Sequence, residues 1–159
     1  MKKEFFRVSE WQDEGPDFEQ VMALDNKFFP TPWDYAYWQD YIGKNLSKLY
    51  IFRIHLELVG FALFGIDHFA KQAHLLKIMI KPSWRRHHLG EYGLKESLTQ
   101  LQTFGMNSCF LEVNARNTAA IELYKKLGFQ ILTRKKHFYS SGDDAFAMEL
   151  DFICALSLE

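Results

Sequence analysis

An α+β fold with a mixed sheet is the architecture that this sequence predicts. Three observations support it. β-Branched and aromatic residues dominate positions 49–80, which is typical of strands. Two later segments carry apolar residues at helical spacing, and each ends at a glycine that suits a helix C-terminus. The chain has 159 residues, enough for one domain with a real core, so we expect a single domain over 1–159.

The first elements follow from local composition. Phe5 to Ser9 is predicted to be a short strand. Pro16 suits the first turn of a helix. The segment Phe29-Pro30-Thr31-Pro32-Trp33 ends that helix, because proline disfavours helical geometry in the residue before it. The aromatic residues from Tyr35 to Tyr41 then indicate a second helix.

Three strands are predicted next, at Leu49–Ile54, Val59–Ile66 and Leu75–Ile80. Their short connections favour antiparallel hairpins. A helix is expected from Leu89, with apolar residues on one face. Gly105 is expected to end it.

The last elements are a strand at Phe110–Asn114, a helix at Asn117–Leu127 and two closing strands at Ile131–Phe138 and Ala145–Leu150. The helix has the strongest signals. Asn117 is a favoured N-cap residue, and Gly128 is placed as the C-terminal cap. Helices and strands therefore alternate in an order that requires a mixed sheet.

Composition excludes several classes of protein. The formal net charge is −1, so no overall field draws the chain to nucleic acid or to an anionic membrane. No apolar run reaches the ~18 residues of a membrane span. Cys109 and Cys154 lack metal-ligand spacing and are expected to be reduced thiols. We expect a soluble cytoplasmic protein, as a monomer or homodimer.

The segment from Ile78 to Gly90 is the most informative in the chain. It is predicted to be a strand end, a turn at Pro82, a basic loop and the start of a helix. A loop that leads into a helix N-terminus offers unpaired N–H groups and the positive end of the helix dipole. This combination suits a phosphate or pyrophosphate. By itself the signal is weak, since basic strand-to-helix loops are common.

Residues further along make the signal specific. Leu111-Glu112-Val113-Asn114-Ala115-Arg116-Asn117 is followed by Ala120, Tyr124 and Leu127-Gly128-Phe129. With the loop and the order of elements, these residues resemble a GNAT-type N-acetyltransferase. The most similar subfamily is the ribosomal-protein-alanine N-acetyltransferases, which modify protein α-amino groups. The resemblance is ungapped from Lys77 to Phe129 and implies a mostly antiparallel sheet with helices on both faces.

Acetyl transfer from a thioester requires a neutral amine, a polarised carbonyl and a proton for the leaving thiolate. The resemblance implies that Glu112 takes the proton from the ammonium, directly or through water, and that Tyr124 protonates the sulfur. Positioned acids and bases are each worth roughly 10²–10⁴ in rate. Trp33 and Tyr139, where the resemblance is looser, are expected to line the acceptor site.

The resemblance also implies acetyl-CoA as co-substrate, with no metal. The backbone of Ile78, Met79 and Ile80 would hold the thioester and the pantetheine arm, and Asn117 would hydrogen-bond the arm. The pyrophosphate would lie on the loop residues Arg85, Arg86, His87, His88, Leu89, Gly90 and Glu91. A metal site at His87 and His88, with His68 and His74, is not expected, because adjacent loop residues rarely point at one ion and no Cys or carboxylate partner has suitable spacing.

Each candidate residue also has a structural interpretation. Glu112 alternates with Leu111 and Val113, so it faces away from them and could be a solvated strand charge. Tyr124 lies on the apolar stripe of its helix and could be a core residue. Asn117 could be an N-cap only, and Tyr139 a structural aromatic of the closing strands.

One position departs from the family pattern. His88 stands where the family loop has its first glycine, a residue that allows close approach of a ligand and adopts positive φ without cost. A Cβ there affects the fit of the cofactor rather than the fold.

The acceptor we expect is the N-terminal amine of a protein or peptide, and the alternative within the class is a small-molecule amine. A hypothesis from another class is a non-catalytic domain that binds acetyl-CoA or a peptide, although such a domain needs neither Glu112 nor Tyr124. A third is association with a partner through aromatic residues of the second helix.

The sequence generates one direct prediction. Acetyl-CoA binds the folded chain and not the unfolded one, so it should raise the melting temperature. A thermal denaturation series with increasing acetyl-CoA measures the shift. No shift at millimolar acetyl-CoA would count against an acetyl-CoA enzyme.

Overall fold

The computed structural model describes residues 5–12, 15–42 and 44–155. The chain forms two compact units. The first contains residues 1–66 and 76–97, and the second contains residues 67–75 and 98–159. The prediction of a single domain stays a prediction.

The first unit is built on antiparallel strands. β1 (Phe6–Glu10) pairs with β2 (Ser47–Ile54), and β2 pairs with β3 (Glu57–Asp67). The β2–β3 connection is tight, and His55 takes a φ of 52° in it. β3 is buried over nearly its whole length, as a strand covered on both faces must be.

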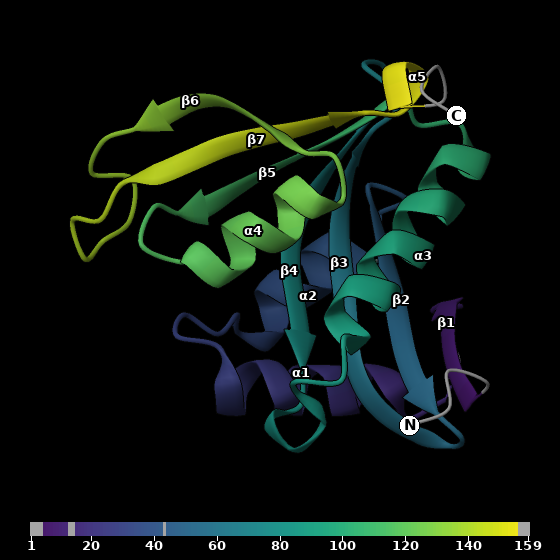
Figure 1. The fold of residues 1–159 in the computed structure, drawn as a ribbon. Coiled ribbons are helices and arrows are strands. Elements are labelled where there is room, and N and C mark those ends of the chain that lie inside the picture. The colour runs from purple at the N-terminus through teal and green to yellow at the C-terminus, as the bar shows by residue number, and fades with distance from the viewer. Residues whose placement is uncertain (1–4, 13–14, 43, 156–159) are drawn as a thin grey trace. The chain divides into compact units, whose positions relative to one another are not determined.

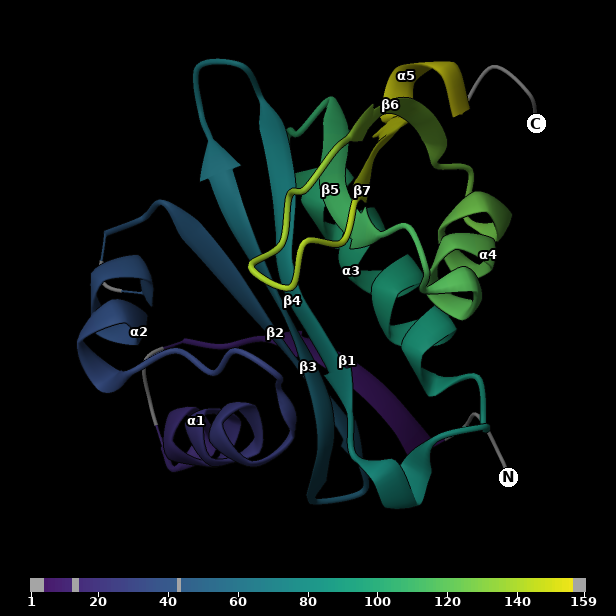
Figure 2. The same ribbon diagram turned by 90° about the vertical axis from the view of Figure 1, so that its left-hand side faces the viewer.

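Helices cover both faces of these strands. α1 (Asp17–Phe28) and α2 (Tyr35–Ile42) lie on one face, and the N-terminal half of α3 (Leu89–Phe104) lies on the other (Figure 2). The first face encloses a core of helix and strand residues: Val21, Leu24, Trp38, Leu49, Ile51, Leu58, Phe61, Leu63 and Met79.

The opposite face depends on a close approach of helix and strand. A Cβ added at Gly93 would lie 2.5 Å from the ring of Phe52, which is fully buried. Only a glycine allows α3 to approach β2 this closely. The start of α3, with the predicted loop before it, is therefore fixed against the strands of its own unit.

β4 (Gln72–Ile80) contributes to both units, since Gln72 to Leu75 belong to the second and Leu76 to Ile80 to the first. In the second unit, β4 pairs in parallel with β5 (Ser108–Asn114), with His74 opposite Phe110.

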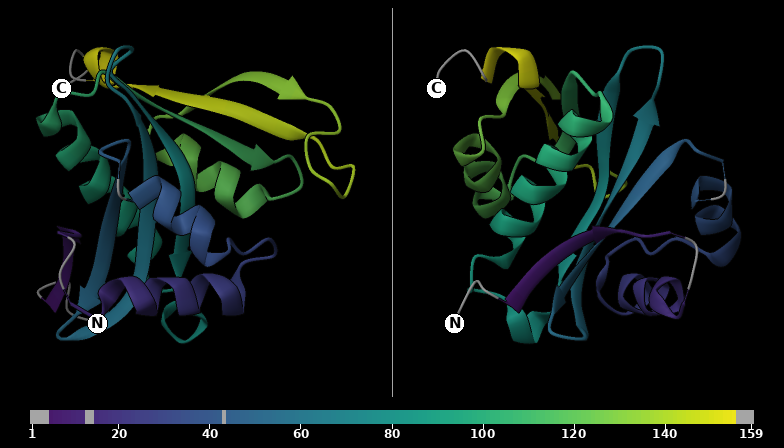
Figure 3. Two further views of the ribbon diagram at one scale, coloured as in Figure 1. Left: turned by 180° about the vertical axis from the view of Figure 1, so that it is seen from behind. Right: turned by 90° about the vertical axis from the view of Figure 1, so that its right-hand side faces the viewer.

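β7 (Ala145–Asp151) pairs antiparallel with β5 and with β6 (Gln130–Lys135). α4 (Thr118–Lys126) lies alongside β5 (Figures 1 and 3). A short α5 (Phe152–Ala155) follows β7.

The predicted fold class is confirmed. The seven strands have the hydrogen-bonded order β1-β2-β3-β4-β5-β7-β6, and the β4–β5 pair is parallel. The helix signals at Asn117 and Gly128 are confirmed too. The Asn117 side chain accepts a hydrogen bond from the N–H of Ala120, and Gly128 takes a φ of 100°.

The turn predicted at Pro82 is confirmed as a single 3-10 turn at Pro82–Trp84. β6 ends at Lys135 rather than at Phe138, and α5 was not predicted. Cys109 is a buried thiol outside any disulfide. The side chain of Cys154 lies outside what the structure describes.

Candidate active site

Glu112 lies on the polar face of β5, as its alternation predicts. Leu111 and Val113 on either side of it are buried, whereas Phe110, Glu112 and Asn114 are half-buried. The carboxylate side chain is 15% exposed. A charge this enclosed needs hydrogen-bond partners, because burial without them is costly.

Two strands supply those partners. His74 on β4 places Nε2 2.6 Å from Oε2 of Glu112, and Lys135 at the end of β6 places Nζ 3.1 Å from Oε1. An ionised carboxylate only accepts hydrogen bonds, so the imidazole donates through Nε2–H. Glu112 therefore has a partner on each oxygen.

Aromatic rings surround this group of charges. The ring of His74 lies 5.1 Å from that of Phe110, edge to face. The ammonium of Lys135 lies 5.4 Å from the centre of the Phe110 ring and 5.2 Å from that of Phe138. Such contacts stabilise a cation without neutralising it, so they fix the position of Lys135 beside Glu112.

Tyr124 lies on the buried face of α4, 7% exposed, with its ring 5.8 Å from that of Phe129. Burial raises the pKa of Tyr124 to about 12, and Cys109 and Tyr139 add to the effect. Burial also raises the pKa of the Cys109 thiol. Tyr124 is therefore a protonated hydroxyl at neutral pH, able to donate a proton and unable to act as a base.

Tyr139 lies in the loop between β6 and β7. Burial raises the pKa of Tyr139, and the charge of Glu112 raises it further, so the phenol and the carboxylate interact electrostatically. The Tyr139 N–H donates to the Asp143 carbonyl, and the Gly142 N–H donates to the Tyr139 carbonyl. Tyr139 is thus part of a closed turn.

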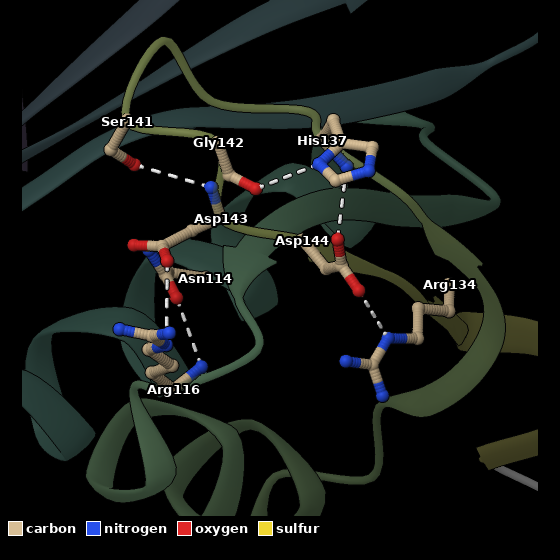
Figure 4. Close-up of polar contacts among 8 residues, drawn as sticks. All are labelled: Asn114, Arg116, Arg134, His137, Ser141, Gly142, Asp143 and Asp144. Carbon is tan, nitrogen blue, oxygen red and sulfur yellow. Dashed lines mark hydrogen bonds and ion pairs between the residues drawn. The ribbon is translucent and has the colours of Figure 1, made fainter.

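A polar network holds that turn in place (Figure 4). Asp143 accepts a hydrogen bond from Asn114 Nδ2 at 3.0 Å and pairs with Arg116 at 3.3 Å. Asp144 accepts from Arg134 Nε at 2.7 Å and from the His137 N–H at 2.9 Å. Hydrogen bonding lowers the pKa of both aspartates, chiefly through Asn114 for Asp143 and through His137 for Asp144. The network also explains why β6 ends early, since His137 takes a φ of 51° to make its contact.

The first unit holds the predicted cofactor loop. Arg86 and His88 take φ values of 64° and 59°, the left-handed region that favours glycine. His88, which stands where the family pattern has a glycine, therefore adopts a backbone conformation that favours glycine. Its ring is exposed, with Nδ1 3.5 Å from the Glu91 carboxylate. Arg85 donates from Nε to the Ile80 carbonyl at 3.1 Å, which ties the loop to the end of β4.

Trp33, the other residue expected at the acceptor site, lies between α1 and α2 in the first unit. Its ring contacts those of Tyr37, Tyr41 and Trp38, with centres 4.6, 5.0 and 5.2 Å away. The main-chain N–H of Trp33 donates to the Asp25 carboxylate at 2.9 Å. Trp33 is therefore held in place rather than free to move.

The predicted residues thus divide by unit. Glu112, Tyr124 and Tyr139 fall in the second unit together with Asn117, and the loop, Ile78 to Ile80 and Trp33 fall in the first. The sequence analysis missed His74 and Lys135 as partners of Glu112. The predicted strand begins at Leu75, one residue after His74, whereas β4 begins at Gln72 and its alternation of half-buried and buried residues includes His74.

Two kinds of feature are absent from the described residues, a metal-binding group and a membrane-spanning helix. No group of three or more His, Cys, Asp and Glu side chains is placed to hold a metal ion there. Within the same residues, no helix is both long and apolar enough to cross a membrane.

Comparison with known proteins identifies the family. The model of the acetyltransferase (GNAT) family matches residues 11–129. The N-alpha-acetyltransferase of Sulfurisphaera tokodaii is 24% identical over 143 residues, which cover 83% of this chain and 86% of that protein.

Solved structures agree as well. The ribosomal-protein-S18-alanine N-acetyltransferase from Escherichia coli has a TM-score of 0.82 at 25% identity, over 92% of this chain and 93% of that one. The spermidine N-acetyltransferase from Vibrio cholerae, solved with CoA and spermine, has a TM-score of 0.81 over 94% of this chain and 96% of that one. At 16% identity the latter is a likeness of fold alone.

The family match spans well over half of the chain, and the elements follow the same fold. The chain belongs to the acetyltransferase (GNAT) family and is an N-acetyltransferase.

Proposed function

We propose that this enzyme transfers the acetyl group of acetyl-CoA to the α-amine at the N-terminus of a protein or peptide. The observation that carries the proposal is the Glu112 carboxylate, held on one oxygen by His74 and on the other by Lys135. The names of the Sulfurisphaera and Escherichia relatives, both protein N-acetyltransferases, support the class of acceptor.

In the proposed reaction the amine nitrogen attacks the thioester carbonyl carbon, the C–N bond forms and the C–S bond breaks. Glu112 takes the proton that the ammonium must lose before it can attack, directly or through a water. His74 supports this step by holding Oε2 of the carboxylate through its Nε2 atom. Lys135 holds the other oxygen of Glu112 and orients it.

Tyr124 supplies the proton that the leaving thiolate requires. Its pKa of about 12 keeps the hydroxyl protonated throughout the working range of pH. A phenol in this environment donates a hydrogen bond to the sulfur as negative charge develops there, and completes the transfer as the thiolate leaves. Acid and base are thus separate groups, one buried on a helix and one held on a strand.

Acetyl-CoA is the proposed acetyl donor. The start of α3 offers unpaired N–H groups to its pyrophosphate, and the loop Arg85 to Glu91 leads into that helix. The left-handed φ of His88 keeps the backbone of a glycine-type loop at this point. The main chain of Ile78 to Ile80 is proposed for the pantetheine arm, with Asn117 as its side-chain partner.

The turnover test uses peptides with free N-termini, spermidine as a small-molecule amine and acetyl-CoA as donor, with release of free thiol as the readout. Glu112→Gln and Tyr124→Phe should each lower kcat/KM for a peptide by about 10²–10⁴. Glu122→Gln, an exposed glutamate on α4, serves as the control and should leave the rate unchanged.

Two results of the turnover test would oppose the proposal. Full activity of both Glu112→Gln and Tyr124→Phe, with unchanged melting temperatures, would remove the acid and base assignments. Acetylation of spermidine without acetylation of any peptide would place the enzyme among small-molecule acetyltransferases.

A second prediction concerns the environment of Tyr124. The phenol ionises near its ordinary pKa of 10.0 in the unfolded chain but at about 12 in the folded one. Below pH 10 it therefore has no effect on stability, and stability is lost as the pH rises from 10 toward 12. Between about pH 9 and about pH 11 the wild type should lose roughly 1 kcal/mol more free energy of unfolding than Tyr124→Phe. Urea denaturation of both proteins measures this difference, and equal losses would mean that the hydroxyl is solvated rather than buried.

A further inference from the structure

Two buried charges in the first unit take no part in the proposed chemistry. Asp25 lies on α1 and Lys77 on the part of β4 that belongs to this unit, with Oδ1 and Nζ 2.6 Å apart. Their side chains are 0% and 2% exposed. Burial lowers the pKa of Lys77, although Asp25 opposes the shift.

Both charges face the connection between α1 and α2, the segment Phe29–Trp33. The Asp25 carboxylate accepts from the Trp33 N–H at 2.9 Å and from the indole N–H of Trp38 at 3.0 Å, both on Oδ2. The Lys77 ammonium lies 3.5 Å from the Thr31 carbonyl oxygen. It also lies 4.2 Å from the centre of the Phe29 ring and 4.7 Å from that of Trp33.

Stability alone does not account for this pair. Replacing a buried ion pair by apolar residues of similar volume is often neutral or stabilising, and Val21, Leu24 and Met79 already form an apolar core in the same unit. Apolar residues cannot, however, provide hydrogen-bond partners for main-chain groups. The segment needs such partners, because Pro30 and Pro32 lack N–H groups and keep it out of helix and strand.

The consequence is a fixed Trp33. Its main-chain N–H is held by Asp25, and its ring contacts the Lys77 ammonium and the aromatic residues of α2. Phe29 is held at two points. Its main-chain N–H donates to the main-chain carbonyl of Asp25 at 3.0 Å, and the Lys77 ammonium lies near its ring.

We propose that the Asp25–Lys77 pair positions the Phe29–Trp33 segment for binding of the acceptor, and so sets the affinity of the enzyme for its acceptor amine. The inference rests on the proposed function and on the role that the family resemblance implies for Trp33, which is to line the acceptor site. Asp25 and Lys77 are positioning residues, since they act through Trp33 and do not touch the reacting atoms.

The test compares a neutral double variant with a matched control. Asp25→Leu with Lys77→Met removes both charges together, so neither is left buried without its partner, and it also removes the acceptor of the Trp33 and Trp38 N–H groups. Lys48→Met is the control, because Lys48 also forms a 2.6 Å ion pair within the first unit, with Glu10, but joins β2 to β1 rather than to the segment. Thermal denaturation first establishes that each variant is folded at the assay temperature.

We expect the double variant to raise KM for a peptide acceptor about tenfold or more, with kcat and the KM for acetyl-CoA within about twofold of wild type. Lys48→Met should leave all three constants unchanged. A merely structural role would lower the active fraction and hence kcat, without this selective change. An unchanged acceptor KM in the folded double variant would overturn the proposal.

A second measurement needs neither turnover nor a variant. Hydrogen exchange followed by NMR should show the Trp33 amide and the Trp38 indole N–H of the wild type protected to the same degree as the amides of α1. Exchange of these groups at the rate of an open loop would overturn the positioning role. If the wild type acetylates no peptide, the proposed function fails, and the exchange experiment still decides whether the pair holds the segment.

Discussion

The position of the Glu112 carboxylate is the constraint on which the second unit depends. A charge on a strand that is only 15% exposed is tolerated when each oxygen has a hydrogen-bond donor. His74 and Lys135 reach Glu112 because β4 pairs in parallel with β5 and because β7 pairs with both β5 and β6. The pairing of strands distant in sequence therefore creates the carboxylate site on which the proposed reaction depends.

The first unit also holds an enclosed carboxylate, and there its partner is a buried ammonium. Asp25 and Lys77 are enclosed more completely than Glu112, and they neutralise each other. Their remaining hydrogen-bonding capacity is directed at a proline-containing segment that cannot satisfy its own main chain. In the second unit the paired carboxylate is proposed to take a proton from the acceptor, and in the first unit the paired carboxylate holds a segment in place. The Asp25 carboxylate is suited to holding a segment, because a buried ammonium that lost its proton would leave that carboxylate charge unpaired.

Much of the fold could be predicted from local patterns, because alternation and caps act over a few residues. The buried and half-buried alternation of β5 and the N-cap bond from Ala120 to Asn117 are of this kind. The partners of Glu112 could not be predicted from such local patterns, since His74 is 38 residues away in sequence and contacts Glu112 only through strand pairing. The end of β6 was missed for the same reason, because Asp144 on the far side of the loop determines it. By residue type, Lys77 would be expected on the solvated face of a strand. It lies two residues from both Leu75 and Met79, however, so it shares their buried face.

The pH dependence of kcat/KM for a peptide acceptor, measured for wild type and for Glu112→Gln, tests the role of this carboxylate most directly. If Glu112 removes the proton from the bound ammonium, the wild type remains active below the α-amine pKa of about 8, and the variant loses about tenfold per pH unit there because it depends on amine that is already neutral. The variant should recover toward the wild-type rate as the pH rises above that value. Two profiles of the same shape, displaced by a constant factor at every pH, would contradict the assignment of Glu112 as the base.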